Sequence, residues 1–338
     1  IASGVRFGRT LPGPVTLVVR NKDYENWRTR MSPEPQAETC TRITRPRPGH
    51  ADFAGALKYE LDDIRDILER SSARTTAALV AAGALCRSLL DTIGVQIMSH
   101  VCAIGAVHAP AVEVSALERL YEAIEASPVR CADESTTKAM VAAIDAATEA
   151  GDTLGGVFEV VAIGCPPGLG TPAQWDRRLD ARLAAALMSI QAVKGVEIGA
   201  GFEGAQRLGS EVHDAIASDA EEGYVRRSNN AGGIEGGISN GEPIVIRCAM
   251  KPLPTLRKRL TSVDMTKQEE APAHFERSDV CSVPAAGVIG EAMMAIVLAD
   301  AALERFGGDS LAAFLRNWEA TKARLADRGY TGVRWSKS

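Results

Sequence analysis

Apolar residues recur along this chain with two different periods, and stretches of the two kinds alternate. Runs rich in valine and isoleucine predict strands at Val15–Arg20, Val95–Val107, Val157–Ile163 and Pro243–Met250. Apolar positions three or four residues apart predict helices at Ala51–Leu68, Ser72–Ile93, 112–126, 136–149, Asp176–Ile190, 287–306 and 309–327. Ser71 or Ser72 is expected to cap the second of these helices. The pattern therefore predicts a mixed α and β fold.

Two long stretches show neither period. The first, punctuated by proline, runs up to Gly49, and the second is the glycine-rich stretch Gly195–Gly241. We predict that the second is a mostly irregular loop, and irregular loops of that length usually serve a function. No linker rich in proline or serine divides the chain, so we expect residues 1–338 to form a single domain.

The composition narrows the class of protein. The chain has 338 residues, of which 46% are hydrophobic, and a net charge of −5, which argues against nucleic acid as the main partner. No apolar run reaches the roughly 18 residues that a membrane span needs. The cysteines are scattered and form no C-x-x-C pair, so we expect reduced, mostly buried thiols in a cytoplasmic protein. They are Cys40, Cys86, Cys102, Cys131, Cys165, Cys248 and Cys281.

Several common chemistries have no motif in this chain. There is no G-x-x-x-x-G-K-[ST] phosphate loop, no H-E-x-x-H or Cys/His cluster that would indicate a metal, and no G-x-S-x-G nucleophile elbow. The glycine-dense stretch NNAGGIEGGISNG at 229–241 does not fit the G-x-G-x-x-G dinucleotide pattern. We therefore expect no metal site, and a site that handles anions remains.

Cationic side chains stand beside proline, glycine or serine at four places. Arg45 and Arg47 precede His50 in the stretch RPRPGHAD at 45–52. The segments at 70–74, 251–255 and 277–279 likewise place a cationic residue beside proline or serine. Arginine suits carboxylate and phosphate because it donates two parallel hydrogen bonds, and a helix N-terminus offers free N–H groups to an anion. Each cluster taken alone also fits ordinary solvated arginines on a surface.

Longer motifs carry a resemblance to a known family. The segments TRPRPGHADFAGALKY, LERSSAR, DTLGG, SIQAVKGVEIGAGF, NNAGGIEGGISNG, AMKPLPT and ERSDVCSVPAAGV are similar, in this order, to chorismate synthases. The resemblance covers nearly the whole chain. It implies an α+β fold, a β-α-β sandwich with a helical layer between sheets, and a homotetramer.

The resemblance also implies an activity and a set of binding residues. Chorismate synthases remove phosphate and a ring proton from 5-enolpyruvylshikimate 3-phosphate in a 1,4-anti elimination, and they need reduced FMN. The implied substrate-binding residues are Arg47, Ser72, Arg74 and Arg277. The implied FMN-binding residues are Arg70, Ser71, Ser72, Gln191, Ala192, Gly236, Lys251, Pro252, Leu253, Pro254, Thr255 and Arg277. Nothing in the sequence indicates an NADP site, so we expect an external source of reduced flavin.

Two residues are implied to move protons. His50 is expected to act as a proton donor that tunes the charge of the flavin, since imidazole titrates near neutral pH. Asp279 is expected to help the flavin remove the ring proton, with Arg277 keeping its carboxylate ionised. Without the family motif, His50 also fits a loop histidine that caps a helix, and Asp279 an ordinary partner of Arg277.

The chain departs from the family pattern in two respects. The family's N-terminal G-E-S-H-G motif, whose histidine protonates the leaving phosphate, is absent, so we expect an N-terminally truncated chain. Thr75 stands where the family usually has glutamate. Two alternatives stay open: an inactive FMN-binding relative, and an enzyme acting on phosphorylated sugars or nucleotides with the same arginines.

Overall fold

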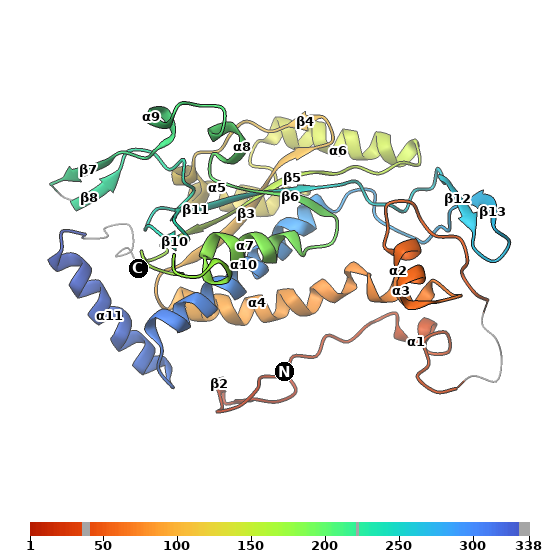
Figure 1. Cartoon of the computed structure of the whole chain (residues 1–338), viewed down its shortest axis with the longest axis horizontal. Helices are drawn as coiled ribbons and strands as arrows, with labels where there is room; N and C mark the ends of the chain where they lie inside the picture. The colour runs from red at the N-terminus through yellow and green to blue at the C-terminus, as the bar shows by residue number, and fades with distance from the viewer. Residues whose placement is uncertain (36–40, 221–222, 331–338) are drawn as a thin grey trace. The chain divides into compact units, whose positions relative to one another are not determined.

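The computed structural model describes residues 1–35, 41–220 and 223–330 and divides into two compact units (Figure 1). The first unit comprises Ile1–Ala78, Thr148–Thr153 and Leu253–Asp279. The second comprises Leu79–Ala147, Leu154–Pro252 and Val280–Ser338. Each unit therefore gathers segments that are distant in the sequence.

The first unit contains short elements around a small apolar core. Ile43, Ala56, Ile64 and Leu68 are buried together, with Met265 packed against them. The elements are β1 (Val5–Arg6), β2 (Arg9–Thr10), α1 (Tyr24–Trp27), α2 (Asp52–Tyr59), α3 (Arg65–Arg70), the 3₁₀ turn η1 (Ala73–Thr75), β12 (Thr261–Asp264) and β13 (Glu269–Pro272). The hairpin β12–β13 was not predicted from the sequence.

Two predictions for this unit are wrong. The helix predicted at Ala51–Leu68 is two helices, because Glu60 adopts a left-handed conformation (φ 56°) that ends α2. The strand predicted at Val15–Arg20 is absent from the described residues: Thr16 alone forms an isolated bridge, to Ser3, and Val18 and Val19 are exposed. A run of β-branched residues forms a strand only where a neighbouring strand pairs with it.

The second unit is built on a five-stranded antiparallel sheet with the order β4-β3-β5-β11-β6. These strands are β3 (Gln96–Ile104), β4 (Val107–His108), β5 (Gly156–Ile163), β6 (Val193–Ile198) and β11 (Ile244–Met250). Three predicted strands are thus confirmed, but Val95–Val107 turns at Gly105 (φ 55°) into the hairpin β3–β4. In the described part of the chain, every other sheet has two strands.

Helices cover both faces of this sheet. On one face α10 (Val283–Phe306) contacts β3 and β5 (Figure 1). Gly290 of this helix lies against the side chains of Phe158 and Val160. On the other face Leu117 and Ile124 of α5 (Val114–Ala126) pack with Met98 and Val161. The remaining helices are α4 (Thr76–Asp91), α6 (Glu134–Glu149), η2 (Trp175–Arg177), α7 (Leu179–Met188) and α11 (Leu311–Asp327).

By length and composition alone, α10 is long and apolar enough to cross a membrane, which was not expected from the sequence. Its most apolar window is 67% buried inside the protein, as expected of a core helix. Helix α4 also packs on it: a Cβ added at Gly83 would come within 2.4 Å of the Ala292 Cβ.

The glycine-rich stretch is more regular than predicted. It contains part of β6, α8 (Gly201–Gly204), α9 (Gly209–Val212), β7 (Ile216–Asp219), β8 (Gly223–Arg226), β9 (Ile234–Glu235) and β10 (Ile238–Ser239). Two consecutive positive φ angles, at Gly236 (59°) and Gly237 (83°), close the tight turn between β9 and β10. Glycine here serves hairpins as well as loops.

The described cysteines are free thiols, as predicted, but only half of them are buried, fewer than expected. Six are free thiols, namely Cys86, Cys102, Cys131, Cys165, Cys248 and Cys281, and three of them are buried. Burial raises the pKa of Cys165 to about 12. Cys40 lies outside the described residues.

Candidate active site

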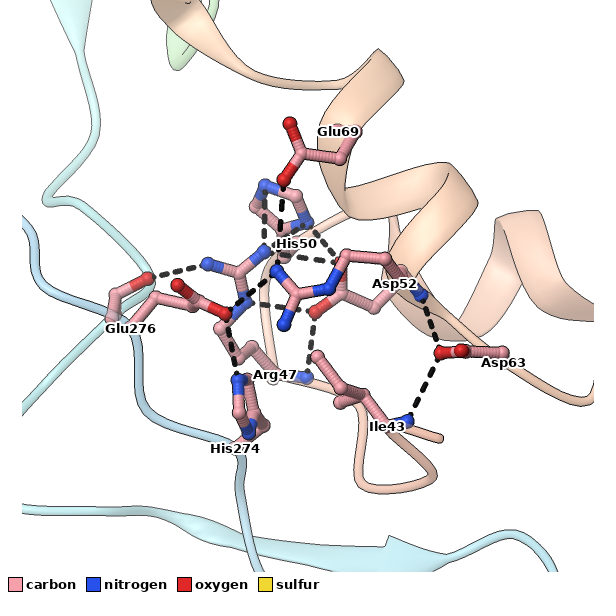
Figure 2. Close-up of polar contacts among 10 residues, drawn as sticks. Ile43, Arg47, His50, Asp52, Asp63, Glu69, His274 and Glu276 are labelled. Atoms are coloured by element: carbon pink, nitrogen blue, oxygen red, sulfur yellow. Dashed lines mark hydrogen bonds and ion pairs between the residues drawn. The ribbon is translucent and has the colours of Figure 1, made fainter. Parts of the chain in front are cut away.

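A buried carboxylate organises the stretch from Arg45 to Asp52 in the first unit (Figure 2). Asp52 is the first residue of α2, and its side chain is 0% exposed. Its Oδ2 accepts hydrogen bonds from the Nε of Arg47 at 2.8 Å and from the Arg47 backbone N–H at 3.1 Å. The Arg47 Nη2 donates to Oδ1 at 3.2 Å. Both oxygens of the carboxylate thus hold the guanidinium of Arg47.

Arg47 also joins two distant parts of the chain. Its Nη1 donates a hydrogen bond of 2.8 Å to the Oγ1 of Thr255, 208 residues away. The side chains of both residues are buried. The structure therefore brings together two residues that the sequence analysis had assigned to substrate and to FMN.

His50 completes the cluster. Its Nδ1 lies 2.5 Å from Oδ1 of Asp52, and its two ring nitrogens lie 3.2 and 3.3 Å from Nη2 of Arg47. Burial of Asp52 favours its neutral form, but the hydrogen bonds from His50 and Arg47 outweigh burial and hold the pKa of this carboxyl well below its usual range. Asp52 is therefore an anion between two basic side chains.

The hairpin β12–β13 and the segment after it support this loop. The Oγ of Ser262 donates to the carbonyl oxygen of Pro46, and the backbone N–H of His274 donates to the carbonyl oxygen of Arg45 at 3.1 Å. Proline at 46 and 48 restricts the backbone further. The loop that carries Arg47 and His50 is thus fixed by hydrogen bonds as well as by its own stiffness.

A second ionic cluster precedes Arg277 and Asp279. Oε1 of Glu276 lies 2.9 Å from Nη1 of Arg65 and 2.9 Å from Nε2 of His274 (Figure 2). Burial favours the neutral form of Glu276, but the hydrogen bond from His274 and the charge of Arg65 prevail and lower its pKa. These contacts anchor the chain immediately before the two predicted site residues.

Arg277 and Asp279 themselves are exposed. Within the described part of the chain no ion pair joins them, so the expected pairing of Asp279 with Arg277 is not formed. Two exposed side chains gain little from such a contact, because water screens their charges. Both are therefore open to a ligand in this structure.

The predicted residues 70–74 join the end of α3 at Arg70 to the 3₁₀ turn η1 that begins at Ala73. Ser72 is the N-cap of η1, its Oγ accepting from the Arg74 backbone N–H at 3.3 Å, which settles the choice between Ser71 and Ser72. Arg70 and Arg74 are exposed. Hydrogen bonds from Asn26 and Trp27 lower the pKa of Asp23, and the charges of Arg74 and Arg277 add to this effect. The two arginines, 203 positions apart, thus act on one carboxylate and gather positive charge in one region of the unit.

The remaining predicted FMN residues belong to the second unit, except Leu253 and Pro254, which lie in the first. The backbone N–H of Lys251 donates to the carbonyl oxygen of Ala192 at 2.9 Å, so the segments at 191–192 and 251–252 are adjacent. Burial, and secondarily the charge of Lys194, lower the pKa of Lys251. Gly236 is exposed, and a Cβ at this position would meet nothing within 4 Å.

The sequence analysis missed two groups. Asp52 stands inside the quoted motif, two residues after His50, a spacing at which a carboxylate can fold back on the ring. His100, Cys102 and Glu159 also approach one another, with possible ligand atoms within 4.8 Å and the His100 Nε2 3.1 Å from the Glu159 Oε1. They line a cavity of about 460 Å³ in the second unit, and the His100–Glu159 hydrogen bond accounts for two of the three without an ion.

Comparison with known proteins decides the family. A family model described as chorismate synthase matches residues 1–303. The chain belongs to the chorismate synthase family. Among individual relatives, the chorismate synthase of Desulforudis audaxviator is 59% identical over 318 residues, covering 94% of this chain and 81% of the relative. The chorismate synthase of Pelobacter propionicus is 54% identical over 333 residues, covering 96% and 84%.

A solved structure agrees with these sequence relatives. It is described as the crystal structure of chorismate synthase, and it matches with a TM-score of 0.74 and 42% identity over 96% of this chain and 84% of that one. The resemblance, the lyase class and the α+β fold class expected from the sequence are thereby confirmed. As a chorismate synthase, the chain is an enzyme of aromatic amino acid biosynthesis.

Proposed function

We propose that this chain converts 5-enolpyruvylshikimate 3-phosphate to chorismate by 1,4-anti elimination of phosphate, with reduced FMN as cofactor. The observation that carries the proposal is the cluster of Arg47, His50 and Asp52, in which a histidine of defined orientation lies beside a buried arginine and carboxylate. The substrate has two carboxylates and a phosphate, and such a charge requires several guanidinium groups.

Two features of the residues assigned to the cofactor are compatible with binding of reduced FMN. Lys251 offers a partly buried cation, and the open backbone at Gly236 permits close approach of a flat ring. We assign Arg70, Ser71, Ser72, Gln191, Ala192, Gly236, Lys251 to Thr255 and Arg277 to the cofactor. When bound, reduced FMN would supply electron density to the allylic system that loses phosphate.

We assign substrate binding and proton transfer to different side chains of the chain. Arg74 and Arg277, exposed and in one region of positive charge, bind substrate anions together with Ser72, and Arg47, which is buried against Asp52 and Thr255, adds its positive charge to the site. His50 gives or takes a proton at Nε2, because its Nδ1 faces Asp52. Asp279, exposed and without an ion-pair partner among the described residues, accepts the ring proton.

The wider assignments rest on the family resemblance. We propose that the two units act as one catalytic domain, in a cytoplasmic homotetramer that receives reduced flavin from a separate source. Analytical ultracentrifugation of the purified chain tests the tetramer, and added NADPH without a reductase tests the flavin source.

FMN binding is the first experiment. We expect titration with FMN to change the flavin absorption spectrum saturably, and with higher affinity when substrate is present. A flat titration with and without substrate would contradict the cofactor assignment. Saturable binding without chorismate formation under anaerobic reducing conditions would instead support a non-catalytic flavin-binding protein.

Asp279→Asn tests the assigned base. The substitution keeps the shape of the side chain and removes its basic charge, so we expect chorismate formation to fall by about 10²–10⁴-fold with little change in substrate affinity. Asp66→Asn, at an exposed position of α3, is the matched control and should retain the parent rate. Equal rates for Asp279→Asn and the parent would remove Asp279 from the mechanism.

A further inference from the structure

The carboxylate of Asp52 has more partners than an ordinary ion pair. It accepts three hydrogen bonds from Arg47 and is paired with His50, and all of these groups come from a stretch of six residues. The side chain is 0% exposed, whereas that of His50 keeps 17% of its surface exposed. A buried anion thus contacts a basic group that still reaches solvent.

The donors around Asp52 determine which ring nitrogen of His50 carries a proton. Asp52 is ionised, so both of its oxygens can only accept hydrogen bonds. At 2.5 Å from Oδ1, the Nδ1 of His50 must therefore be the donor, and it carries the proton in the neutral ring. Nε2 is then the atom that is bare in the neutral ring and protonated in the imidazolium.

We propose that Asp52 is a positioning residue that fixes His50 in the Nδ1–H form, so that Nε2 is the atom through which protons enter and leave the site. This inference rests on the proposed function, in which His50 handles a proton. Arg47 takes part because its guanidinium occupies Oδ2 and part of Oδ1, which leaves only the remaining side of Oδ1 for the ring. The motif spacing of five residues between Arg47 and Asp52, and two between His50 and Asp52, allows one carboxylate to hold both.

Replacing Asp52 with asparagine should invert the arrangement. Two donors of Arg47, its backbone N–H and Nε, face the Oδ2 position, so the amide oxygen of the introduced side chain is expected to occupy that position. The amide NH₂ group then faces the Nδ1 of His50. A nitrogen that meets a donor must accept, so the proton of the neutral ring moves to Nε2.

Nitrogen NMR of the protein without FMN or substrate reads this directly. Histidine labelled with ¹⁵N gives signals from five side chains, and the His50→Gln variant identifies those from His50. At a pH well above the ordinary histidine pKa of about 6.5, we expect Nδ1–H in the parent and Nε2–H in Asp52→Asn. An Nε2–H ring in the parent, or an Nδ1–H ring in Asp52→Asn, overturns the proposal.

Ser262→Ala is the matched control. It removes a hydrogen bond from the same loop, at Pro46, without touching the carboxylate, so the tautomer of His50 should stay as in the parent. A change of tautomer in this variant would mean that general loosening of the loop, and not the carboxylate, sets the ring. The spectrum of the parent protein alone can contradict the proposal. The proposal therefore stays testable even if Asp52→Asn folds poorly.

Anaerobic turnover completes the test. With the proton on the wrong nitrogen, kcat of Asp52→Asn should fall by about 10²–10⁴-fold, the range for loss of general acid–base catalysis. An inverted tautomer with unchanged kcat would overturn the positioning role. Absence of turnover by the parent protein would overturn the proposed function, and the NMR result would still decide whether Asp52 orients His50.

Discussion

Two buried carboxylates, one in each unit, have opposite electrostatics. Asp52 in the first unit and Glu291 in the second are 0% and 5% exposed in their side chains, and both are bound by basic groups. The oxygens of Glu291 lie 2.8 Å from Arg87, 3.0 Å from Arg130 and 2.7 Å from the hydroxyl of Ser99. Yet the pKa of Asp52 is lowered and that of Glu291 is raised.

The difference lies in how far short-range hydrogen bonds compensate for burial. At Glu291 desolvation is the largest effect, and the hydrogen bond from Ser99 and the charges of Arg130 and Arg87 do not cancel it. At Asp52 the hydrogen bonds from His50 and Arg47 do. The partners of Asp52 lie within five residues, whereas Arg87 and Glu291 are 204 residues apart. Glu291 thus joins α4, β3 and α10, while Asp52 orders one loop.

The largest expected effect follows from removing Glu291. Glu291→Ala removes the carboxylate that pairs with Arg87 and Arg130, and although Arg130 keeps Glu125, its Nε is already buried without a hydrogen bond among the described residues. Breaking a buried pair in this way costs about 3–5 kcal/mol, so the free energy of unfolding should fall by that amount in urea denaturation followed by circular dichroism. A loss below about 1 kcal/mol, the ordinary value for an exposed pair, would contradict the structural role.

The pH dependence of stability should have opposite signs at the two carboxylates. Asp52 has a folded pKa below its unfolded value of 3.8, so its contribution is full above that pH and is lost as the pH falls through the folded pKa. Glu291 has a folded pKa above 4.5, so its contribution is full below that pH and is lost as the pH rises through the folded pKa.

Asp52→Asn and Glu291→Gln make this contrast measurable. Between about pH 7 and pH 3, the stability advantage of the parent over Asp52→Asn should shrink with acid by about 1 kcal/mol, because only protonation of the unfolded carboxyl, from its pKa of 3.8, falls in this range. Its advantage over Glu291→Gln should grow over the same range. Urea midpoints across this range supply the data. Two advantages that change in the same direction would show that one of the two assignments is reversed.

An exposed pair gives the smallest expected effect and calibrates the others. Glu319 and Lys322 form an i,i+3 pair on α11 at 3.2 Å, with side chains 61% and 39% exposed. Glu319→Ala should lower the free energy of unfolding by about 0–1 kcal/mol. A larger loss would mean that the urea assay exaggerates electrostatic contributions, and the value for Glu291→Ala would have to be reduced accordingly.

The sequence predicted well the elements that bury their own apolar pattern. The strands near β5 and β11 and the helix near α7 were placed within a few residues, because their periodicity reflects packing in and against one sheet. Val15–Arg20 was wrong because a strand needs a partner, and the sequence of a single segment does not say whether one is present. The hairpin β12–β13, rich in charged and polar residues, gave no apolar signal at all.

The sequence predicted the residue types of the candidate site but not the contacts among them. The motif RPRPGHAD identified Arg47 and His50, and the family resemblance added Thr255, yet only the fold shows that Arg47 reaches Thr255 across 208 residues. Asp52 was overlooked because an aspartate at the start of a helix is ordinarily exposed, and nothing local predicts its complete burial. The role of Asp52 becomes visible only in the folded chain, where its carboxylate is hydrogen-bonded to Arg47 and His50.

A double-mutant cycle on His50 and Asp52 tests the central claim most directly. Single-turnover rates of chorismate formation under anaerobic reducing conditions are compared for the parent, His50→Gln, Asp52→Asn and the double variant. If Asp52 acts through His50, the double variant should be no slower than His50→Gln, and the coupling energy should equal nearly the whole effect of Asp52→Asn. Independent effects, in which the two losses multiply, would contradict the account.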